Sequence, residues 1–248
     1  MYLVCSAIIA CLIACLLFAA QAQQAVYLSL GSIEFVPSIN GVVIAAPHGR
    51  YDKNTDLVAI SVAKMLGSGY IIARGFVENN VRINVNRPTE LCRGFQGCEC
   101  MSTRAAEVYS RYMQILQGLR DRERFSLYVE IHGNDALGRD NVIEIANVGL
   151  SSVGAVKIKG VFKSQLAVLK RRHPDYPDID LKMEPVDHLF YRASQAKRIG
   201  SLSANIFDKA LHVELPVSVR QEDTIRPTAE LLSALIQRFD EQSGKGAN

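Results

Sequence analysis

Histidines and carboxylates recur where three short apolar runs of the chain end. His48 and Asp52 follow the first run, His132 ends the second, and Glu214 lies near the end of the third. Two imidazoles, one carboxylate and an open position for water form a ligand set that suits catalytic zinc. A carboxylate that does not bind the metal can then take a proton from that water. The spacing therefore indicates a metal-dependent hydrolase.

Each of these residues also has a simpler interpretation when it is taken alone. Asp52 or Asp56 could cap the helix that follows, because Asp is a preferred N-cap residue. Glu214 could be a buried, paired carboxylate with a structural role. Their joint position at strand ends favours a metal site over these separate roles. Asp56 is an alternative to Asp52 as the carboxylate ligand. We expect His212 to face away from Glu214 and leave it outside the site, because side chains alternate along a strand.

A polar segment at residues 81–90 adds groups that could bind a substrate. It contains Arg82 and the pair Asn86-Arg87. The planar guanidinium of arginine binds carboxylates with two parallel hydrogen bonds. An Asn-Arg pair beside a metal could hold a substrate carboxylate while the metal polarises a neighbouring carbonyl. The alternative is a surface loop whose arginine pairs with Glu78 or Glu90.

The elements that must position these residues follow from the alternation of apolar runs and amphipathic stretches. We predict an α/β fold: a single domain with a mostly parallel (mixed) central sheet flanked by helices, phosphorylase/hydrolase-like. In such sheets, sites form at the carboxyl ends of strands. The predicted strands are 42–46, 70–73, 126–131, 142–146 and 210–214. The predicted helices are 55–66, 105–119, 162–172 and 227–239, and 175–185 is predicted as a loop.

The first 22 residues differ in composition from the rest of the chain. Nineteen of the first twenty are apolar, and no charged residue occurs before Glu34. The small residues around Ala22 predict signal-peptide cleavage after it. Lipidation at Cys15 and an uncleaved membrane anchor are the alternatives. We therefore expect residues 1–22 to be a signal peptide or anchor, and residues 23–248 to be an exported (secreted or periplasmic) catalytic domain.

Charge and length exclude several classes of protein. The chain has 248 residues, 21% of them charged, and a net charge of +3. This balance excludes a disordered charged chain and gives no electrostatic case for binding nucleic acid. Contact with a membrane is expected only through residues 1–22, if they are retained or lipidated.

Three cysteines outside the apolar head, Cys92, Cys98 and Cys100, lie close together. Export favours a disulfide, but three thiols cannot all pair with one another. We expect one local disulfide from Cys92 to Cys98 or Cys100, and one thiol left over. A metal cluster would need a fourth cysteine nearby.

The order of these motifs resembles the zinc carboxypeptidase superfamily in its broad sense. That superfamily has a histidine with a nearby acid, an Asn-Arg pair, a strand-ending histidine and a late glutamate before a leucine. Here the order is His48 with Asp52, Asn86-Arg87, His132 and Glu214-Leu215. The resemblance is closest to N-formylglutamate amidohydrolase-like and poly-gamma-glutamate hydrolase-like proteins.

The resemblance covers about residues 41–216 and implies roles for the residues that carry it. His48, Asp52 and His132 would bind Zn²⁺. Glu214 would be the general base that activates water and then protonates the leaving amine. The chain departs from the carboxypeptidase pattern because it has His-x-x-x-Asp where carboxypeptidases have His-x-x-Glu.

The same resemblance implies a substrate that carries a carboxylate. Arg87, with Asn86, would hold that carboxylate, and Arg82 or Arg74 would polarise the scissile carbonyl. The predicted function is an exported zinc-dependent hydrolase of an amide or peptide bond near a carboxylate. Acylated amino acids, gamma-glutamyl chains and cell-wall-type peptides all fit this description.

Two other functions stay open at this point. The first is a non-catalytic exported binding domain on the same fold, in which Glu214 is dispensable. The second is a cysteine-dependent enzyme that uses the loop between Cys92 and Cys100. Metal analysis separates the leading prediction from both alternatives.

Overall fold

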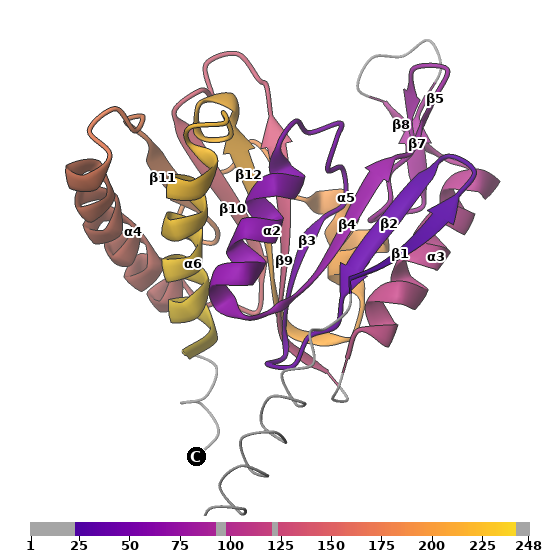
Figure 1. The fold of residues 1–248 in the computed structure, drawn as a ribbon, viewed down its shortest axis with the longest axis horizontal. Coiled ribbons are helices and arrows are strands. Elements are labelled where there is room, and N and C mark those ends of the chain that lie inside the picture. The colour runs from indigo at the N-terminus through magenta and orange to yellow at the C-terminus, as the bar shows by residue number, and fades with distance from the viewer. Residues whose placement is uncertain (1–22, 93–97, 121–123, 242–248) are drawn as a thin grey trace, which may run out of the picture.

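An eight-stranded mixed sheet forms the centre of the molecule (Figure 1). The computed structural model describes residues 23–92, 98–120 and 124–241. The strand order is β1-β2-β4-β3-β9-β12-β10-β11. The strands of this sheet are β1 (Gln24–Leu28), β2 (Gly31–Val36), β3 (Val42–Ala46), β4 (Gly69–Gly75), β9 (Phe125–Asn134), β10 (Val142–Val148), β11 (Asp180–Met183) and β12 (Phe207–Pro216).

Two short hairpins lie outside the sheet, between β4 and the helix that precedes β9. One joins β5 (Val77–Glu78) to β6 (Val81–Arg82). The other joins β7 (Thr89–Leu91) to β8 (Glu99–Met101). Both carry residues of the polar segment identified in the sequence.

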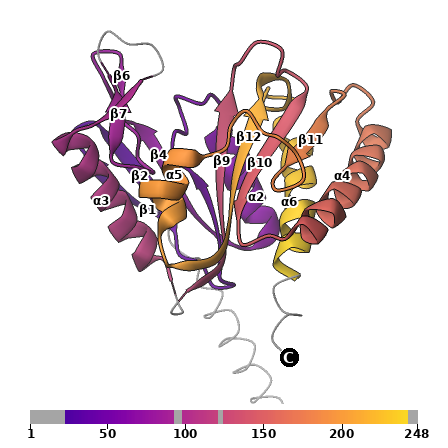
Figure 2. The same cartoon turned by 180° about the vertical axis from the view of Figure 1, so that it is seen from behind.

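Helices cover both faces of the sheet, as Figures 1 and 2 show from opposite sides. One apolar core packs α2 (Thr55–Leu66), α4 (Ser152–Arg172) and α6 (Ile225–Glu241) against one face. A second core packs α3 (Thr103–Gly118) and α5 (Ser194–Ile199) against the other. This arrangement confirms the predicted α/β fold with a mixed, mostly parallel sheet.

Three neighbouring strands, β3, β9 and β12, position the residues of interest. β3 pairs with β9 and β9 pairs with β12, both in parallel. All five residues of β3 are buried, which explains its uninterrupted apolar sequence. Because parallel strands end at the same edge of a sheet, the segments after β3, β9 and β12 meet in one place.

Several element boundaries differ from the sequence prediction. Helix α4 begins at Ser152, ten residues before the predicted start, and the side chain of Ser151 caps it by accepting a hydrogen bond from the Gly154 amide at 3.2 Å. Its first turns expose Val153 and Val156, which blurs the amphipathic pattern. The predicted loop 175–185 contains β11, an edge strand that pairs in parallel with β10.

The apolar head, with the predicted cleavage at Ala22 and lipidation at Cys15, lies outside the described residues. Within the residues that are described, no helix combines the length and the apolar composition needed to cross a membrane.

Candidate metal centre

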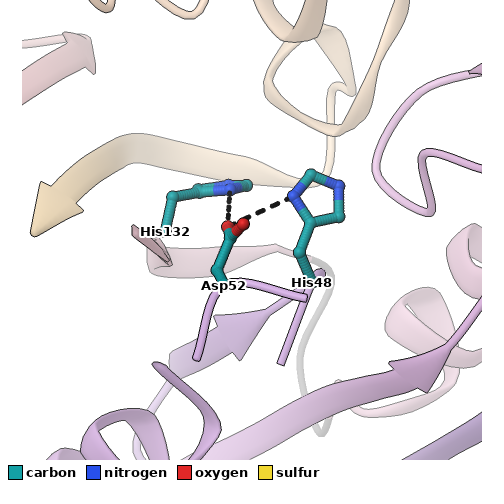
Figure 3. Close-up of side chains that lie close together, drawn as sticks. All are labelled: His48, Asp52 and His132. Carbon is teal, nitrogen blue, oxygen red and sulfur yellow. Dashed lines mark ion pairs between the residues drawn. The ribbon is translucent and has the colours of Figure 1, made fainter. Parts of the chain in front are cut away.

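Two histidines converge on one carboxylate at the ends of β3 and β9 (Figure 3). The Nδ1 atom of His48 lies 3.4 Å from Oδ2 of Asp52, and Nδ1 of His132 lies 3.5 Å from the same oxygen. The three side chains are 3–7% exposed and could together hold a metal ion. His48, Asp52 and His132, the predicted ligands, are therefore brought together.

Both distances are at the long end for a hydrogen bond, and both match the separation of two ligands on one cation. Hydrogen bonds from nitrogen to oxygen are usually about 2.7–3.2 Å long. Ligands about 2.0–2.1 Å from a tetrahedral zinc ion are separated from one another by about 3.3–3.4 Å. The distances from Asp52 Oδ2 to the two nitrogens thus match the separation of neighbouring zinc ligands, and all three ligand atoms lie within 4.8 Å of one another.

The loop between β3 and α2 holds Asp52 in place through its backbone. The Asp52 amide donates to the His48 carbonyl at 2.8 Å, and the Thr55 hydroxyl donates to the Asp52 carbonyl at 2.8 Å. Gly49 packs tightly against β4, where its amide donates to the Ala73 carbonyl at 2.9 Å. A Cβ atom at Gly49 would lie 3.0 Å from that carbonyl, so a side chain would push the loop away.

Arg220 ties this loop to the segments that follow β9 and β12. Its guanidinium donates to the carbonyls of Lys53 and Asn134, at 2.8 and 3.1 Å, and forms an ion pair with Asp135. The side chain is 4% exposed, so these bonds are shielded from water. Gly133 is needed beside it, because a Cβ atom there would lie 2.7 Å from the Arg220 Cζ.

Glu130 is a fully buried carboxylate directly beneath the histidines. Its donors include the Nε2 atom of His132 at 3.3 Å. The remaining donors are Tyr128, Ser201, Asn86 and His212. Burial opposes ionisation of Glu130, but the hydrogen bonds from the two histidines outweigh it and hold its pKa well below the ordinary value. A carboxylate behind a ligand histidine fixes the ring orientation and makes the other nitrogen a better donor to metal.

The protonation of the three converging residues is set by burial and by their contacts. Burial lowers the pKa of His48 to about 4. Burial would also lower the pKa of His132, but hydrogen bonds with Asp52 and Glu130 raise it to about 9. Burial opposes ionisation of Asp52, yet the two histidines hold its pKa well below the ordinary value. Asp52 is therefore an anion, and a cation at this position would displace the proton from His132.

Glu214 lies beside His132 on the adjacent strand, in register with it. Both line a cavity of about 970 Å³ together with His48 and Asp52. Our expectation that His212 faces away is wrong, because its Nε2 lies 2.9 Å from Glu214 Oε1. Residues alternate between faces one at a time, so residues two apart point the same way.

Asp56, the alternative ligand, is engaged elsewhere. Its Oδ2 accepts a hydrogen bond from Arg74 Nε at 2.8 Å, and Arg74 also pairs with Glu34 at 2.6 Å. Neither Asp56 nor Arg74 lines the cavity. The structure therefore places Asp52, and not Asp56, with the histidines, and leaves Arg82 as the candidate for polarising a carbonyl.

Arg82 and Arg87 both line the cavity. Arg82 stacks over the Tyr51 ring at 4.8 Å, and its Nε is buried without a hydrogen-bond partner among the described residues. Arg87 donates from Nε and Nη2 to both carboxylate oxygens of Glu99, at 2.9 and 2.6 Å. The paired edge of Arg87 is thus occupied, whereas Arg82 makes a longer ion pair with the same carboxylate, 3.7 Å from Nη2 to Glu99 Oε1.

Asn86 sits behind the cavity and does not line it. It is fully buried, donates to Glu130 at 3.0 Å and accepts from Arg87 Nη1 at 3.0 Å. Asn86 therefore links the arginine that faces the cavity to the carboxylate beneath the histidines.

The three cysteines are free thiols, and the expected local disulfide is not formed. The Sγ atoms of Cys92 and Cys98 are 3.4 Å apart, compared with about 2.05 Å in a disulfide. Hydrogen bonding with Cys100, followed by desolvation, raises the pKa of Cys92 to about 12. A cysteine nucleophile needs the opposite shift, so this finding opposes Cys92 as a nucleophile.

Sequence reasoning missed Glu130 and His212. Glu130 precedes His132 by two residues, and His212 precedes Glu214 by two. A period of two inside an apolar run is the signal that places both pairs on one face of the sheet. Arg220 and Glu99 have no comparable signal, because their partners are distant in sequence.

Comparison with solved structures finds matches at low sequence identity. The structure of a bacteriophage poly-gamma-glutamate hydrolase matches with a TM-score of 0.51 and 12% identity, over 88% of this chain and 93% of that one. A metallo-carboxypeptidase from Burkholderia cenocepacia matches with a TM-score of 0.46 and 12% identity, over 94% of this chain and 68% of that one.

No model of a protein family matches the chain, and no curated protein sequence matches it. The likeness to the poly-gamma-glutamate hydrolase spans nearly the full length of both chains. The chain therefore has the fold of that hydrolase, which confirms the sequence resemblance at the level of the fold.

Proposed function

We propose that the protein is a zinc-dependent hydrolase that cleaves an amide or peptide bond near a substrate carboxylate. The observation that carries this proposal is the convergence of His48, Asp52 and His132 at ligand spacing, in the cavity that also contains Glu214. When bound there, zinc supplies a Lewis acid that polarises a carbonyl and makes water more acidic.

The chain's own residues supply the proton transfers. Glu214 accepts the proton of the attacking water and later delivers it to the nitrogen of the leaving amine. Its place beside His132 on the neighbouring strand, in the same cavity, supports this role. Arg82, which lines the cavity and makes only a long ion pair with Glu99, stabilises negative charge on the scissile carbonyl oxygen.

A substrate carboxylate is the group that best matches the other side of the cavity. Arg82, Arg87 and Arg192 all line the cavity, and Arg192 is exposed. Arg87 can bind such a carboxylate with the same two nitrogens only if one or both of its hydrogen bonds to Glu99 break. Among the candidate substrates, we place gamma-glutamyl chains first, because the bacteriophage protein of the same fold is a poly-gamma-glutamate hydrolase.

Export is part of the same proposal and depends on the sequence alone. The apolar, uncharged head at residues 1–22 supports it. An exported enzyme would act on extracellular amides or peptides, and the mass of the mature protein tests whether the chain begins after Ala22.

The first test combines metal analysis with hydrolysis assays. Purified protein should contain one zinc per chain and hydrolyse gamma-glutamyl peptides, acylated amino acids or cell-wall peptides, and chelation should abolish turnover. Glu214→Gln should lower kcat by about 10²–10⁴-fold with zinc retained, because only the proton acceptor is removed.

Matched variants separate the base from the ligands. His48→Ala and His132→Ala should lose zinc and turnover together. Glu107→Gln, an exposed residue on α3, is the control and should behave like the unmodified protein. Retained turnover in Glu214→Gln would reject its role as the base, and zinc binding without turnover on any substrate would favour a binding domain.

A further inference from the structure

Two carboxylates and two imidazoles alternate on adjacent strands at the cavity, and all of them except Glu130 line it. Along β9 they are Glu130 and His132, and along β12 they are His212 and Glu214. The strand register places His212 beside Glu130 and Glu214 beside His132. Each histidine therefore has a carboxylate both along its own strand and across to the next.

His212 occupies a particular place in this array. Its Nε2 lies 2.9 Å from Glu214 Oε1, and its Nδ1 lies 3.2 Å from Glu130 Oε2. Its ring lies against that of His132, with centroids 4.1 Å apart and the ring planes tilted by 31°. The side chain is 5% exposed, so the ring has little freedom to turn away from either carboxylate.

Glu214 depends on this contact for its orientation. Within the described part of the chain, His212 is its one hydrogen-bond partner, and it engages only Oε1. The second oxygen, Oε2, is left for the cavity that Glu214 lines. A carboxylate held at one oxygen presents the other in a fixed direction, which is what a general base needs.

We propose that His212 is a positioning residue that holds Glu214 in its reactive orientation and is itself anchored by Glu130. This inference rests on the proposed function, in which Glu214 is the base. Glu130 is suited to be the anchor because it is fully buried and held on both oxygens. His212 contacts neither substrate nor metal in this role.

The same residues could be interpreted as a second metal site. Glu130, His132 and His212 also form a group with ligand-like spacing. However, both oxygens of Glu130 already accept hydrogen bonds from neutral donors: Oε2 from Asn86 at 3.0 Å, and Oε1 from Tyr128 at 2.9 Å and from Ser201. The geometry therefore favours positioning over a second ion.

Two substitutions at His212 separate its two contacts. In His212→Asn the amide replaces Nδ1 and keeps the contact with Glu130, whereas in His212→Gln it replaces Nε2 and keeps the contact with Glu214. We expect His212→Asn to lower kcat by about 10–100-fold with little change in KM and one zinc still bound. His212→Gln should recover most of the lost kcat.

Equal kcat in His212→Asn and the unmodified protein would overturn the inference while leaving the proposed function intact. Loss of zinc from two ions to one per chain in His212→Asn would overturn it in favour of the second metal site. Absence of hydrolysis by the unmodified protein would instead reject the proposed function. The contact between His212 and Glu214 would then be tested by NMR alone.

Imidazole NMR tests the contact without any assay of activity. In ¹⁵N-labelled metal-free protein, the Nε2 proton of His212 should be shifted downfield and protected from exchange with water. Glu214→Ala should remove this signature, and the control Glu107→Ala should not. An unchanged His212 signal in Glu214→Ala would show that Glu214 does not hold the ring, and would overturn the inference even if every His212 variant failed to fold.

Discussion

Asp52 and Asp56 are four residues apart, and their surroundings assign them different tasks. Asp52 faces two imidazoles, whereas Asp56 faces Arg74. A divalent cation held by Asp52 and the two imidazoles would take the place of the His132 proton. The guanidinium beside Asp56 does not give up its proton, so no cation can replace it in this way. The difference in partners, rather than in residue type, makes Asp52 the proposed metal ligand.

This difference predicts opposite results for two matched variants. Asp52→Asn should weaken zinc binding by at least about 10-fold, because a charged ligand is lost. Asp56→Asn should leave the zinc affinity within about 2-fold and lower the free energy of unfolding by about 1–3 kcal/mol, because it breaks the pair with Arg74. Competition with a chromophoric chelator measures the affinity, and urea titration measures stability. Weaker zinc binding in Asp56→Asn alone would reverse the assignment.

At the scale of residues, the sequence predicted the polar residues near the ends of strands more successfully than those in the interior of strands. His48, His132 and Glu214 could be found because polar residues at strand ends are conspicuous. His212 and Glu130 were missed because they lie inside apolar runs. Each is two residues before a predicted site residue, and residues two apart on a strand point to the same face. Asn86 was assigned to the substrate, whereas it is buried against Glu130.

At the scale of elements, the β7–β8 hairpin controls one arginine of the cavity. Glu99 on β8 holds Arg87 with two hydrogen bonds and receives a third from the Thr89 hydroxyl at 2.9 Å. Burial opposes ionisation of Glu99, but the bond and charge of Arg87 outweigh it and lower its pKa to about 2, from an ordinary value of 4.5. Glu99 is therefore ionised at neutral pH, and its pair with Arg87 stabilises the hairpin.

The lowered pKa of Glu99 predicts how stability changes with pH. A carboxyl whose pKa falls on folding adds stability that is complete above pH 4.5 and is lost as the pH falls toward 2. Glu99→Gln should lower the free energy of unfolding by about 1–3 kcal/mol at pH 6, and this difference should shrink toward pH 2.5. Urea titrations across this range measure it, with Glu107→Gln as the exposed control. A difference that stays constant with pH would contradict the assignment to Glu99 ionisation.

The elements themselves were predicted best where they are uniformly buried or regularly amphipathic. Strand β3 and helix α2 have the predicted bounds, 42–46 and 55–66. The edge strands β1 and β11 were not predicted, because an edge strand exposes one side and its sequence resembles a loop. The N-terminal half of α4 was missed because it exposes apolar residues.

At the scale of the whole molecule, the order of strands decides whether the predicted residues can meet. β3, β9 and β12 are separated by long stretches of sequence but lie side by side in the sheet. Nothing in the local pattern specifies that order, which is set by the packing of helices on both faces. Two chains with the same motifs and another strand order would hold these residues apart. The site is therefore a property of the fold and should report on its integrity.

Metal binding should accordingly stabilise the entire domain. A ligand that binds only the folded state at 100 times its Kd adds about 2.7 kcal/mol to the free energy of unfolding. For a chain of this size, that gain raises Tm by roughly 5–10 °C. Zinc should thus raise the Tm of chelator-treated protein by this amount, measured by calorimetry, and the increase should be much smaller in Asp52→Asn. Because Asp56→Asn keeps the converging ligands, it should retain the zinc-dependent increase even though its starting Tm is lower. Equal Tm values with and without zinc in the unmodified protein would show that the three residues do not form a metal site.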